Sequence, residues 1–446
     1  MSKKADVLVI GAGPAGIISA VTARKYYPDK NILVMKNVEN GVIPCGIPYM
    51  FASLKNPQDN KLQTTILEKN NINVVADEAI KIIPSEKRVE AKSNTDYFYE
   101  KLILANGSSP VVPPIEGINK RGVHLIYKDL EYLKLMIDEI KKGKNILIIG
   151  GGFIGVELAD EFSKLNGLNV YLVEALPHLL ANSFDVEFSI LAEEKLKTKG
   201  VQILVNTRVE KICGSQSVEK VLFSGGKELV VDNVILAIGA NPNTKLAEAA
   251  GIRLSNGKGI WVDEYMCTSE TDIFAVGDCA CKRDFYTRRD VSVMLASTAT
   301  AEARVAGANL YQLKLVRENK GTIAIYSTYV DGLVLGSAGL TENSASKEGF
   351  EVVTGCCEGT DKHPANLAGA SKVKVKLIFA KQSGIVMGGQ VAGGISCGEM
   401  INSIGIAIQK RVSFTEFETL QVATHPYLTS APTLYPLILA AQDAQI

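Results

Sequence analysis

The chain opens with an unbroken apolar run, a glycine-rich loop and a helical stretch, and this order returns later in the sequence. A run without alternation is typical of a strand that is buried on both faces in a parallel sheet. The first copy predicts a strand at Asp6–Ile10 and a helix at Ile17–Lys25. The second predicts a strand at Asn145–Ile149 and a helix at Val156–Lys164. The pattern indicates two α/β units of the Rossmann type in one chain.

The pattern changes from Gly321 onwards, where short strands alternate with turns and an amphipathic helix follows. This predicts a separate α+β domain. Pro110, Pro113 and Pro114 form a stiff stretch that we interpret as a domain boundary. The other predicted strands are Asn31–Met35, Asn73–Ala76, Arg88–Ala91, a strand from Lys101, Asn169–Val173, Asp232–Gly239, a strand from Asp272, Thr322–Tyr326, Val373–Phe379 and Ile385–Gln390, and the other predicted helices are Leu295–Leu310 and Ser396–Lys410.

Both glycine-rich loops read G-x-G-x-x-G between a strand and a helix, at Gly11–Gly16 and at Gly150–Gly155. In this motif the first glycine makes the turn, the second lets the backbone approach a pyrophosphate, and the third lets the helix pack on the strand. One such loop is a weak signal, whereas two in one chain are far more specific. The sequence therefore predicts two dinucleotide sites.

The residue after the second strand of each unit decides how the ribose is held. In the second unit this strand ends at Glu174, a carboxylate suited to ribose hydroxyls, although a solvated surface glutamate is the alternative. No arginine follows to accept a 2′-phosphate, so NADH is favoured over NADPH. In the first unit Met35 and Lys36 occupy the strand end, and Glu39 is the nearest carboxylate.

A single cysteine, Cys45, stands in the segment Gly41–Tyr49, after the second strand of the first unit. Pro44 keeps the preceding residue extended, and Pro48 suits the first turn of a helix. The segment therefore predicts that Cys45 lies at a helix N-terminus, where the thiol pKa is lowered. Gly46 leaves room for a flat group near the sulfur. The alternative is a buried structural cysteine.

Composition narrows the classes of function. The 446 residues are 46% hydrophobic and 22% charged, which is typical of a soluble protein of two or three domains. The net charge is zero and no basic run stands out, which argues against nucleic acid as a partner. We find no signal peptide or membrane span and expect a cytoplasmic protein. The eight cysteines form no Cys-x-x-Cys pair and the four histidines are scattered, so no metal site is predicted.

Four motifs together resemble the flavin-dependent pyridine nucleotide–disulfide oxidoreductases: Gly11–Gly16, Ile103–Gly107, Gly150–Gly155 and Phe274–Asp278. The family usually has threonine where Asn106 stands. The resemblance implies an α/β protein with two Rossmann-like nucleotide-binding domains and a C-terminal α+β dimerisation domain, in a homodimer with active sites shared across the interface. The implied bounds are 1–114 and 244–320 for FAD, 115–243 for NADH and 321–446 for dimerisation.

Most of this family uses two cysteines, but position 50 is Met. The chain therefore resembles the single-cysteine branch, which holds coenzyme A-disulfide and persulfide reductases, NADH oxidases and NADH peroxidases. Where coenzyme A-disulfide reductases carry a tyrosine before proline-glycine, this chain has His363, and where a second tyrosine is expected near the C-terminus it has the segment Ala423–Tyr427. The segment from His425 resembles the His-Pro-Thr motif of two-cysteine reductases, whose histidine is an acid–base supplied across the dimer; its usual glutamate partner is Ser430 here.

The resemblance implies that NADH reduces FAD, that FAD reduces Cys45, and that the Cys45 thiolate attacks a sulfur–sulfur bond while His425 protonates the leaving thiolate. The acceptor is expected to be a small sulfur or oxygen compound. The alternatives are an NADH oxidase or peroxidase that cycles through Cys45 sulfenic acid, and a flavin-binding redox sensor. Besides catalytic Cys45 and His425, the predicted cofactor-binding residues are Gly11, Ala12, Gly13, Pro14, Ala15, Gly16, Lys36, Cys45, Ala105, Gly107, Asp278, Gly150, Gly152, Phe153, Ile154, Gly155, Glu174 and Gly239.

Overall fold

The computed structural model describes residues 2–317 and 321–445 of the chain. The described residues form two compact units, each assembled from segments that are separated in the sequence. The predicted bounds of the FAD, NADH and dimerisation domains stay a prediction. The first unit comprises Met1–Val111, Ile126–Asp138 and Gly239–Thr322, and the second comprises Val112–Leu125, Glu139–Ile238 and Ile323–Ile446.

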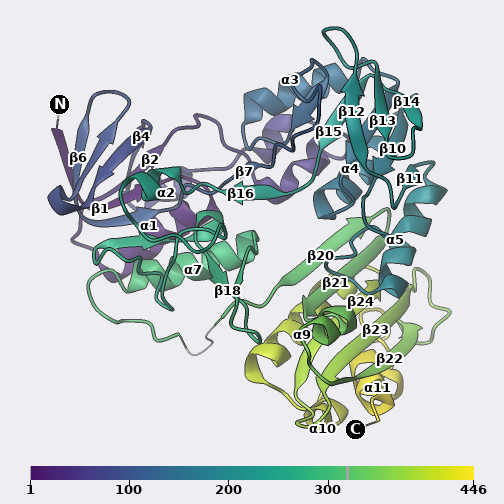
Figure 1. Ribbon diagram of the computed structural model, residues 1–446. Coiled ribbons are helices and arrows are strands. Elements are labelled where there is room, and N and C mark those ends of the chain that lie inside the picture. The colour runs from purple at the N-terminus through teal and green to yellow at the C-terminus, as the bar shows by residue number, and fades with distance from the viewer. Residues whose placement is uncertain (1, 318–320, 446) are drawn as a thin grey trace. The chain divides into compact units, whose positions relative to one another are not determined.

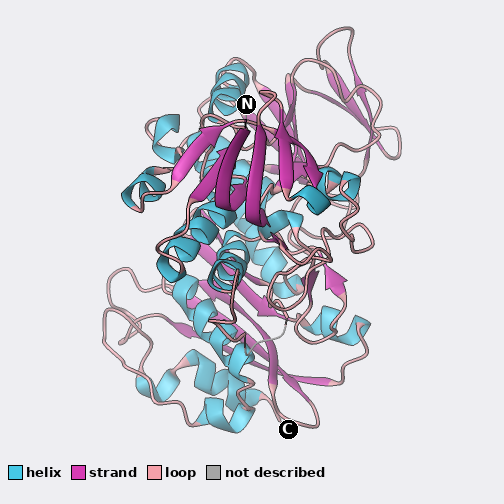
Figure 2. Ribbon diagram, turned by 90° about the vertical axis from the view of Figure 1, so that its left-hand side faces the viewer, coloured by secondary structure: helices cyan, strands magenta, loops and turns pink. Residues whose placement is uncertain are grey.

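The first unit is built on a sheet with the strand order β3-β2-β1-β6-β5-β4, in which β17 also pairs with β6. β1 pairs in parallel with β2 and β6, so it is central, and Val7, Leu8 and Val9 are fully buried. Burial on both faces explains the unbroken apolar run. Figure 2 shows this sheet close to the N-terminus. The elements are β1 (Ser2–Ile10), α1 (Pro14–Tyr26), β2 (Ile32–Lys36), α2 (Thr65–Lys69), β3 (Asn73–Ala76), β4 (Ala79–Ile83), β5 (Arg88–Ala91), β6 (Asp96–Leu104), β7 (Ser108–Pro110), β16 (Ala240–Pro242), α6 (Lys245–Ala249), β17 (Ile273–Ala275), β18 (Lys282–Arg283), β19 (Asp290–Val291) and α7 (Ala296–Ala308).

Helices α1 and α7 of this unit lie against each other (Figure 1). Small residues make this close approach possible, because a Cβ on Gly307 of α7 would lie 2.7 Å from the carbonyl oxygen of Ser19 in α1. The small-residue helix predicted over Leu295–Leu310 is therefore present as α7, and it packs on the helix that follows the first glycine-rich loop.

The second unit contains a parallel sheet with the strand order β11-β10-β9-β15-β8. Its central strand β9 is followed by the second glycine-rich loop and α4, which repeats the arrangement of β1 and α1. A small antiparallel sheet, β12-β13-β14, accompanies it. The elements are β8 (Val123–Leu125), α3 (Leu130–Ile140, which begins in the first unit), β9 (Asn145–Ile149), α4 (Phe153–Ser163), β10 (Asn169–Val173), α5 (Val186–Thr198), β11 (Gln202–Leu204), β12 (Val209–Cys213), β13 (Lys220–Phe223), β14 (Glu228–Val230) and β15 (Asn233–Leu236).

The C-terminal part of the second unit is an antiparallel sheet, β20-β21-β24-β23-β22, with α9 on β21 and β24 and with α11 on β22. The Lys376 side chain, 6% exposed, joins this sheet to the start of α5 through Asp185 at 3.0 Å and Glu187 at 2.7 Å. The predicted α+β composition of this C-terminal part, an antiparallel sheet with helices, is confirmed. The elements are β20 (Ile325–Val330), β21 (Leu333–Gly339), α8 (Glu342–Lys347), β22 (Val352–Thr360), β23 (Lys372–Ala380), β24 (Val386–Gly393), α9 (Cys397–Lys410), α10 (Phe414–Glu418) and α11 (Pro436–Asp443).

Several predicted strands differ from the structure in their bounds, and two of them show why. The strand predicted at Thr322–Tyr326 is β20, which begins at Ile325, because the Thr322 N–H donates to the Arg283 carbonyl oxygen at 2.7 Å and a turn at Asp331 and Gly332 sets the register. The strand predicted at Asp232–Gly239 is the shorter β15, and Gly239 has φ +102°, which no strand residue adopts. Strands Asn73–Ala76, Arg88–Ala91, Asn145–Ile149 and Asn169–Val173 have the predicted bounds.

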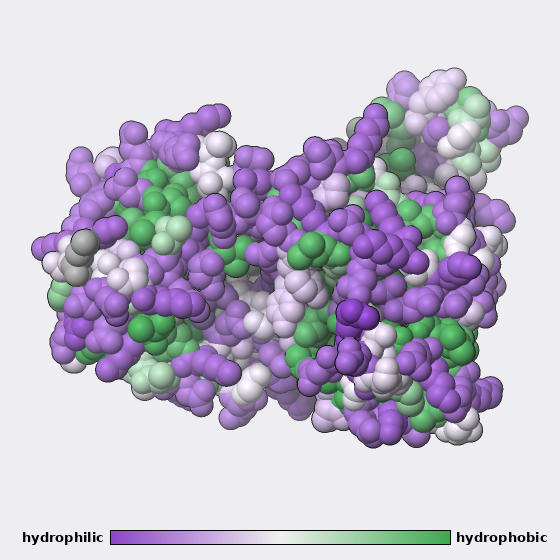
Figure 3. All heavy atoms as spheres, turned by 90° about the horizontal axis from the view of Figure 1, so that it is seen from above, coloured by the Kyte–Doolittle hydropathy of each residue, from purple (hydrophilic) through white to green (hydrophobic). Residues whose placement is uncertain are grey.

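The face of the molecule in Figure 3 is covered mainly by hydrophilic residues, and hydrophobic ones form small separate patches. Such scattered patches are normal on a folded protein. Among the described residues, no helix is long and apolar enough to span a bilayer.

Candidate active site

The first glycine-rich loop leaves space where a pyrophosphate would lie. Gly11 has φ +111°, and a Cβ there would lie 2.2 Å from the Ala105 carbonyl oxygen, while one on Gly16 would lie 1.9 Å from the Gly11 carbonyl oxygen. A Cβ on Gly13 would meet nothing within 4 Å. Gly13 also N-caps α1, which has neither a side-chain cap nor an acidic residue in its first turn. The backbone N–H groups there suit an anionic ligand.

The second loop repeats this geometry. Gly150 has φ +109°, and a Cβ there would lie 2.6 Å from the Ala237 carbonyl oxygen. A Cβ on Gly155 would lie 1.9 Å from the Gly150 carbonyl oxygen, whereas one on Gly152 would meet nothing within 4 Å. Gly152 caps α4 without a side-chain hydrogen bond. Both loops are therefore shaped to cradle a dinucleotide.

The end of β2 in the first unit and the end of β10 in the second make the same backbone contact with the first glycine of their loop. The Gly11 N–H donates to the Met35 carbonyl oxygen at 2.8 Å, and the Gly150 N–H donates to that of Val173 at 2.9 Å. Lys36 therefore occupies the position that Glu174 has in the second unit.

The two side chains make different contacts. The Glu174 carboxylate accepts from the Gly151 N–H at 2.7 Å and from the Leu176 N–H at 2.8 Å, which holds it beside the loop. Lys36 Nζ donates to the Glu39 carbonyl oxygen at 2.9 Å. Glu174 is thus held in one orientation beside the loop, and its role at the ribose, like the role of Lys36, stays a prediction.

Asp278 lies on the turn Gly277–Cys279, directly after β17. Its Oδ2 accepts from Ser108 Oγ at 2.7 Å and from Lys128 Nζ at 3.0 Å. Burial by itself would raise the pKa of this carboxyl, but Lys128 and Ser108 outweigh burial, so the pKa lies below its usual range. Asp278 therefore stays ionised at neutral pH and can accept a hydrogen bond from a ligand hydroxyl. Ser108 and Lys128 were not predicted, because no local motif links them to Asp278.

The Cys45 segment consists of two 3₁₀ turns, Pro44–Gly46 and Pro48–Met50, so the prediction of an α-helix N-terminus at Cys45 is wrong. Pro48 lacks the N–H that would close an α-helical bond to the Pro44 carbonyl. The Ile47 N–H donates to that carbonyl instead, at 3.2 Å. The helix-dipole argument for a lowered thiol pKa loses its basis, since it requires aligned peptide units.

Cys45 is exposed, which excludes the alternative of a buried structural cysteine. Its turn is held from below by Asn60, whose Nδ2 donates to the Ile43 carbonyl oxygen at 3.1 Å and whose carbonyl oxygen accepts from the Ile43 N–H at 2.9 Å. A Cβ on Gly46 would lie 1.9 Å from Asn60 Oδ1, so only glycine fits beside the cysteine. The thiol is therefore presented to solvent on a fixed turn.

His363 and His425 lie on neighbouring segments of the C-terminal sheet domain. The His363 N–H donates to the Pro426 carbonyl oxygen at 3.1 Å, and His363 Nδ1 lies 2.9 Å from the Thr429 carbonyl oxygen, which can only accept. His425 is exposed, and its Nδ1 accepts from the Tyr427 N–H at 3.3 Å. In the neutral ring the proton of His425 is therefore on Nε2.

Comparison with known proteins identifies the family. A model described as pyridine nucleotide-disulphide oxidoreductase matches residues 5–303, and the model of that family's dimerisation domain matches residues 325–435. The chain belongs to this family. Its resemblance to the family, drawn from the four motifs, is confirmed, and so is the fold class.

Relatives of the pyridine nucleotide-disulphide oxidoreductase family cover nearly the whole chain. An NADH oxidase of Methanocaldococcus jannaschii is 32% identical over 98% of this chain and 98% of its own. An NAD(P)H coenzyme A polysulfide/persulfide reductase of Pyrococcus horikoshii is 34% identical over 87% of this chain and 88% of its own. The structure of an NAD-dependent persulfide reductase from A. fulgidus has a TM-score of 0.91 and 30% identity, and the match covers 99% of this chain and 82% of that one.

As a member of this family, the protein is an FAD-dependent oxidoreductase that uses NAD(P)H. The open space at Gly13 and Gly152, and the uncapped helices behind them, fit two dinucleotides. Which loop holds which cofactor, and the individual binding residues, stay predictions. Among the described residues, no group of three or more His, Cys, Asp or Glu side chains could hold a metal ion.

The other predicted cofactor residues lie around the two loops. In the first unit Ala15 contacts the Asp278 turn, since a Cβ on Gly277 would lie 2.8 Å from Ala15 Cβ. Gly107 has φ +67° and accepts from the Asn243 N–H at 3.0 Å. In the second unit Phe153 stacks on Tyr326 with 4.8 Å between ring centroids. The remaining predicted residues are Ala12 and Pro14, half-buried in the first loop, Ile154, exposed at the start of α4, and Gly239, whose carbonyl oxygen accepts from the Val111 N–H.

Glu157, two residues beyond the second loop, is a half-buried glutamate that no sequence motif marked. Thr328 Oγ1 donates to it at 2.8 Å. Burial raises the pKa of Glu157 to about 7, and the nearby Asp160 and Glu161 add to the rise. The folded protein therefore binds a proton here that the unfolded chain has released above pH 4.5 or so.

We expect Glu157→Gln to stabilise the protein at pH 8. Since the pKa is higher in the folded state, the contribution of Glu157 is most favourable below about pH 4.5 and is lost as the pH rises through about 7. The loss is on the order of 3 kcal/mol. Unfolding temperatures from pH 4.5 to 8 should fall less steeply in the variant than in the parent. Glu194→Gln, which removes an exposed glutamate of the same unit, is the control, and equal slopes in all three proteins would contradict the prediction.

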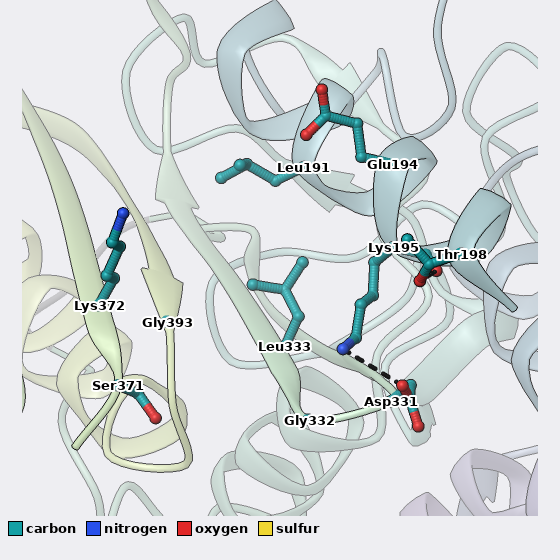
Figure 4. Close-up of a pocket in the computed structure, with 10 residues that line it drawn as sticks. All are labelled: Leu191, Glu194, Lys195, Thr198, Asp331, Gly332, Leu333, Ser371, Lys372 and Gly393. Atoms are coloured by element: carbon teal, nitrogen blue, oxygen red, sulfur yellow. Dashed lines mark hydrogen bonds and ion pairs between the residues drawn. The ribbon is translucent and has the colours of Figure 1, made fainter. Parts of the chain in front are cut away.

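A groove of about 530 Å³ in the second unit lies between α5 and the turn after β20 (Figure 4). Two of its charged side chains neutralise each other in an ion pair, with Lys195 Nζ 3.2 Å from Asp331 Oδ2. None of its lining residues belongs to the glycine-rich loops or to the Cys45 and histidine segments, so it is not part of the candidate active site.

Proposed function

We propose that this oxidoreductase uses NADH to reduce a sulfur–sulfur bond of a small molecule, through Cys45 as the single redox-active cysteine. The observation that carries the proposal is the exposed Cys45 on a turn held by Asn60 and Gly46. The position that usually provides the second cysteine is Met50, 2% exposed, and no disulfide joins Cys45 to another cysteine. The substrate itself then supplies the second sulfur.

The chemistry balances as follows for an acceptor RS–SR′. The Cys45 thiolate attacks one sulfur, a Cys45–SR disulfide forms, and R′S⁻ leaves. Protonated His425 from the second subunit of a dimer donates its Nε2 proton to R′S⁻ and is left neutral, and solvent returns the proton. Bound FAD would supply the two electrons that the cycle needs, taken from NADH as hydride. These electrons release RS⁻ and restore the thiolate, so NADH, a proton and RS–SR′ give NAD⁺, RSH and R′SH.

The nucleotide preference follows from Glu174. Its carboxylate is fixed beside the loop by the Gly151 and Leu176 N–H groups. A fixed negative charge favours ribose hydroxyls and repels a 2′-phosphate. His178, the nearest following base, already contacts Glu193 Oε1 at 3.1 Å. We therefore propose NADH rather than NADPH as the preferred donor.

NADH oxidase activity is the second candidate, because the Methanocaldococcus jannaschii relative of that name covers 98% of this chain. In that case Cys45 cycles through sulfenic acid, which a peroxide forms and two electrons reduce back to the thiolate with release of water.

The test is NADH turnover under nitrogen with polysulfide, a persulfide or coenzyme A disulfide, compared with oxygen and hydrogen peroxide. We expect the sulfur acceptors to give the higher kcat/KM. Each NADH oxidised should yield two thiols from coenzyme A disulfide, and one sulfide from a persulfide or polysulfide. Turnover only with oxygen or peroxide would replace the proposal with the oxidase. Reduction of the flavin that stops without turnover on any acceptor would indicate a redox sensor instead.

A further inference from the structure

The turn that carries Asp278 is pressed against the first glycine-rich loop. Gly277 has φ +73°, a conformation that side chains other than glycine rarely adopt. A Cβ on it would lie 2.8 Å from Ala15 Cβ in the first turn of α1. The position of Asp278 relative to the loop thus depends on what keeps this turn in place.

A fully buried ion pair holds the turn from behind. The side chains of Lys282 and Glu302 are 2% and 3% exposed, and Lys282 Nζ lies 3.2 Å from Glu302 Oε2. Glu302 Oε2 accepts from the Gly277 N–H at 2.9 Å. Lys282 Nζ donates to the carbonyl oxygens of Gly277 and of Ala280, the latter at 2.8 Å. The pair therefore forms hydrogen bonds with the backbone before and after Asp278, at Gly277 and Ala280.

Stability alone is a poor reason for such a pair. Burying two charges is costly, and hydrophobic residues of similar volume often serve a core equally well. Here, however, each charge makes a hydrogen bond that an apolar residue could not make, and each bond ends on the Gly277–Ala280 backbone. Lys282 also helps to keep the pKa of Asp278 low against the effect of burial.

We propose that Lys282 and Glu302 are positioning residues for FAD, which fix the Gly277–Asp278 turn in its ligand-binding conformation without touching the cofactor. Their side chains are buried beneath the turn and are closed to a ligand. The proposal rests on the FAD assignment of this turn and is independent of whether the acceptor is sulfur or oxygen.

The test is the dissociation constant of FAD, measured by adding FAD to apoprotein and following flavin fluorescence. In Glu302→Gln and Lys282→Met, FAD must reorder Gly277 and Asp278 as it binds, and fixing a backbone residue carries a substantial entropy cost. We expect the dissociation constant to rise about 30-fold in each variant. Lys282→Arg keeps the charge and a donor, and it should recover part of the affinity.

A matched control separates positioning from general stability. Lys376→Met removes another buried lysine, paired with Asp185 in the second unit, and should lower the unfolding temperature without changing FAD affinity. If the single variants do not fold, a double variant that carries both Lys282→Gln and Glu302→Gln takes their place. It leaves no unpaired charge in the core. An FAD dissociation constant within twofold of the parent, in the folded variants or in the double variant, would overturn the proposal. Unchanged affinity in Asp278→Ala would overturn it together with the FAD assignment of the turn.

Discussion

Replacing Cys45 by serine should abolish NADH-dependent reduction of sulfur acceptors, with a loss of about a thousandfold or more in kcat. The hydroxyl of serine is not ionised at neutral pH and cannot form the mixed disulfide that the proposed cycle requires. Anaerobic addition of NADH should still bleach the flavin absorbance of the variant, since the nucleotide loops are untouched. The measurement is steady-state NADH oxidation with polysulfide beside stopped-flow reduction of the flavin.

Cys356 provides the matched control for this substitution. It is the other exposed cysteine, and it lies on β22 in the second unit. Partial desolvation raises the pKa of the Cys356 thiol, so less of it is ionised and it is a weaker nucleophile at neutral pH. Cys356→Ser should turn over like the parent. Sulfur reduction that survives in Cys45→Ser, or that disappears in Cys356→Ser, would remove Cys45 from the proposed mechanism.

The sequence was most informative where a backbone position tolerates only one residue type. Gly16 and Gly155 are examples, because any Cβ would collide with the first glycine of its own loop. Such constraints are local, so they can be read from a motif. The apolar runs of strands that are buried on both faces are local in the same way, and two of these strands, Asn145–Ile149 and Asn169–Val173, have the predicted bounds.

The sequence was least informative where contacts join distant segments. Lys128 and Ser108 meet at Asp278 from segments far apart in the chain, and the Lys282–Glu302 pair lies beneath the same turn. No spacing rule connects these residues. The error at Cys45 has a different origin. Two prolines suggested a helix start, but Pro48 removes the hydrogen bond by which an α-helix from Pro44 would continue, and the chain forms 3₁₀ turns.

The two glycine-rich loops allow the cofactor assignment to be tested with one pair of equivalent substitutions. Gly16→Ala and Gly155→Ala each place a Cβ 1.9 Å from a carbonyl oxygen, of Gly11 or of Gly150 respectively. Overpacking of this kind costs on the order of 1–3 kcal/mol. We therefore expect each variant to lose about 10- to 100-fold in affinity for the cofactor at its own loop only.

The two losses should be separable by spectroscopy. Gly16→Ala should be purified with little bound flavin and should bind added FAD weakly, because its loop is predicted to hold FAD. Gly155→Ala should keep its flavin and its visible spectrum, but NADH should reduce that flavin only at much higher concentrations than in the parent. Because the clash is the same in both loops, a difference in fold stability cannot explain opposite phenotypes. The reverse result, with flavin lost from Gly155→Ala and retained in Gly16→Ala, would mean that the FAD and NADH sites have been exchanged in our assignment.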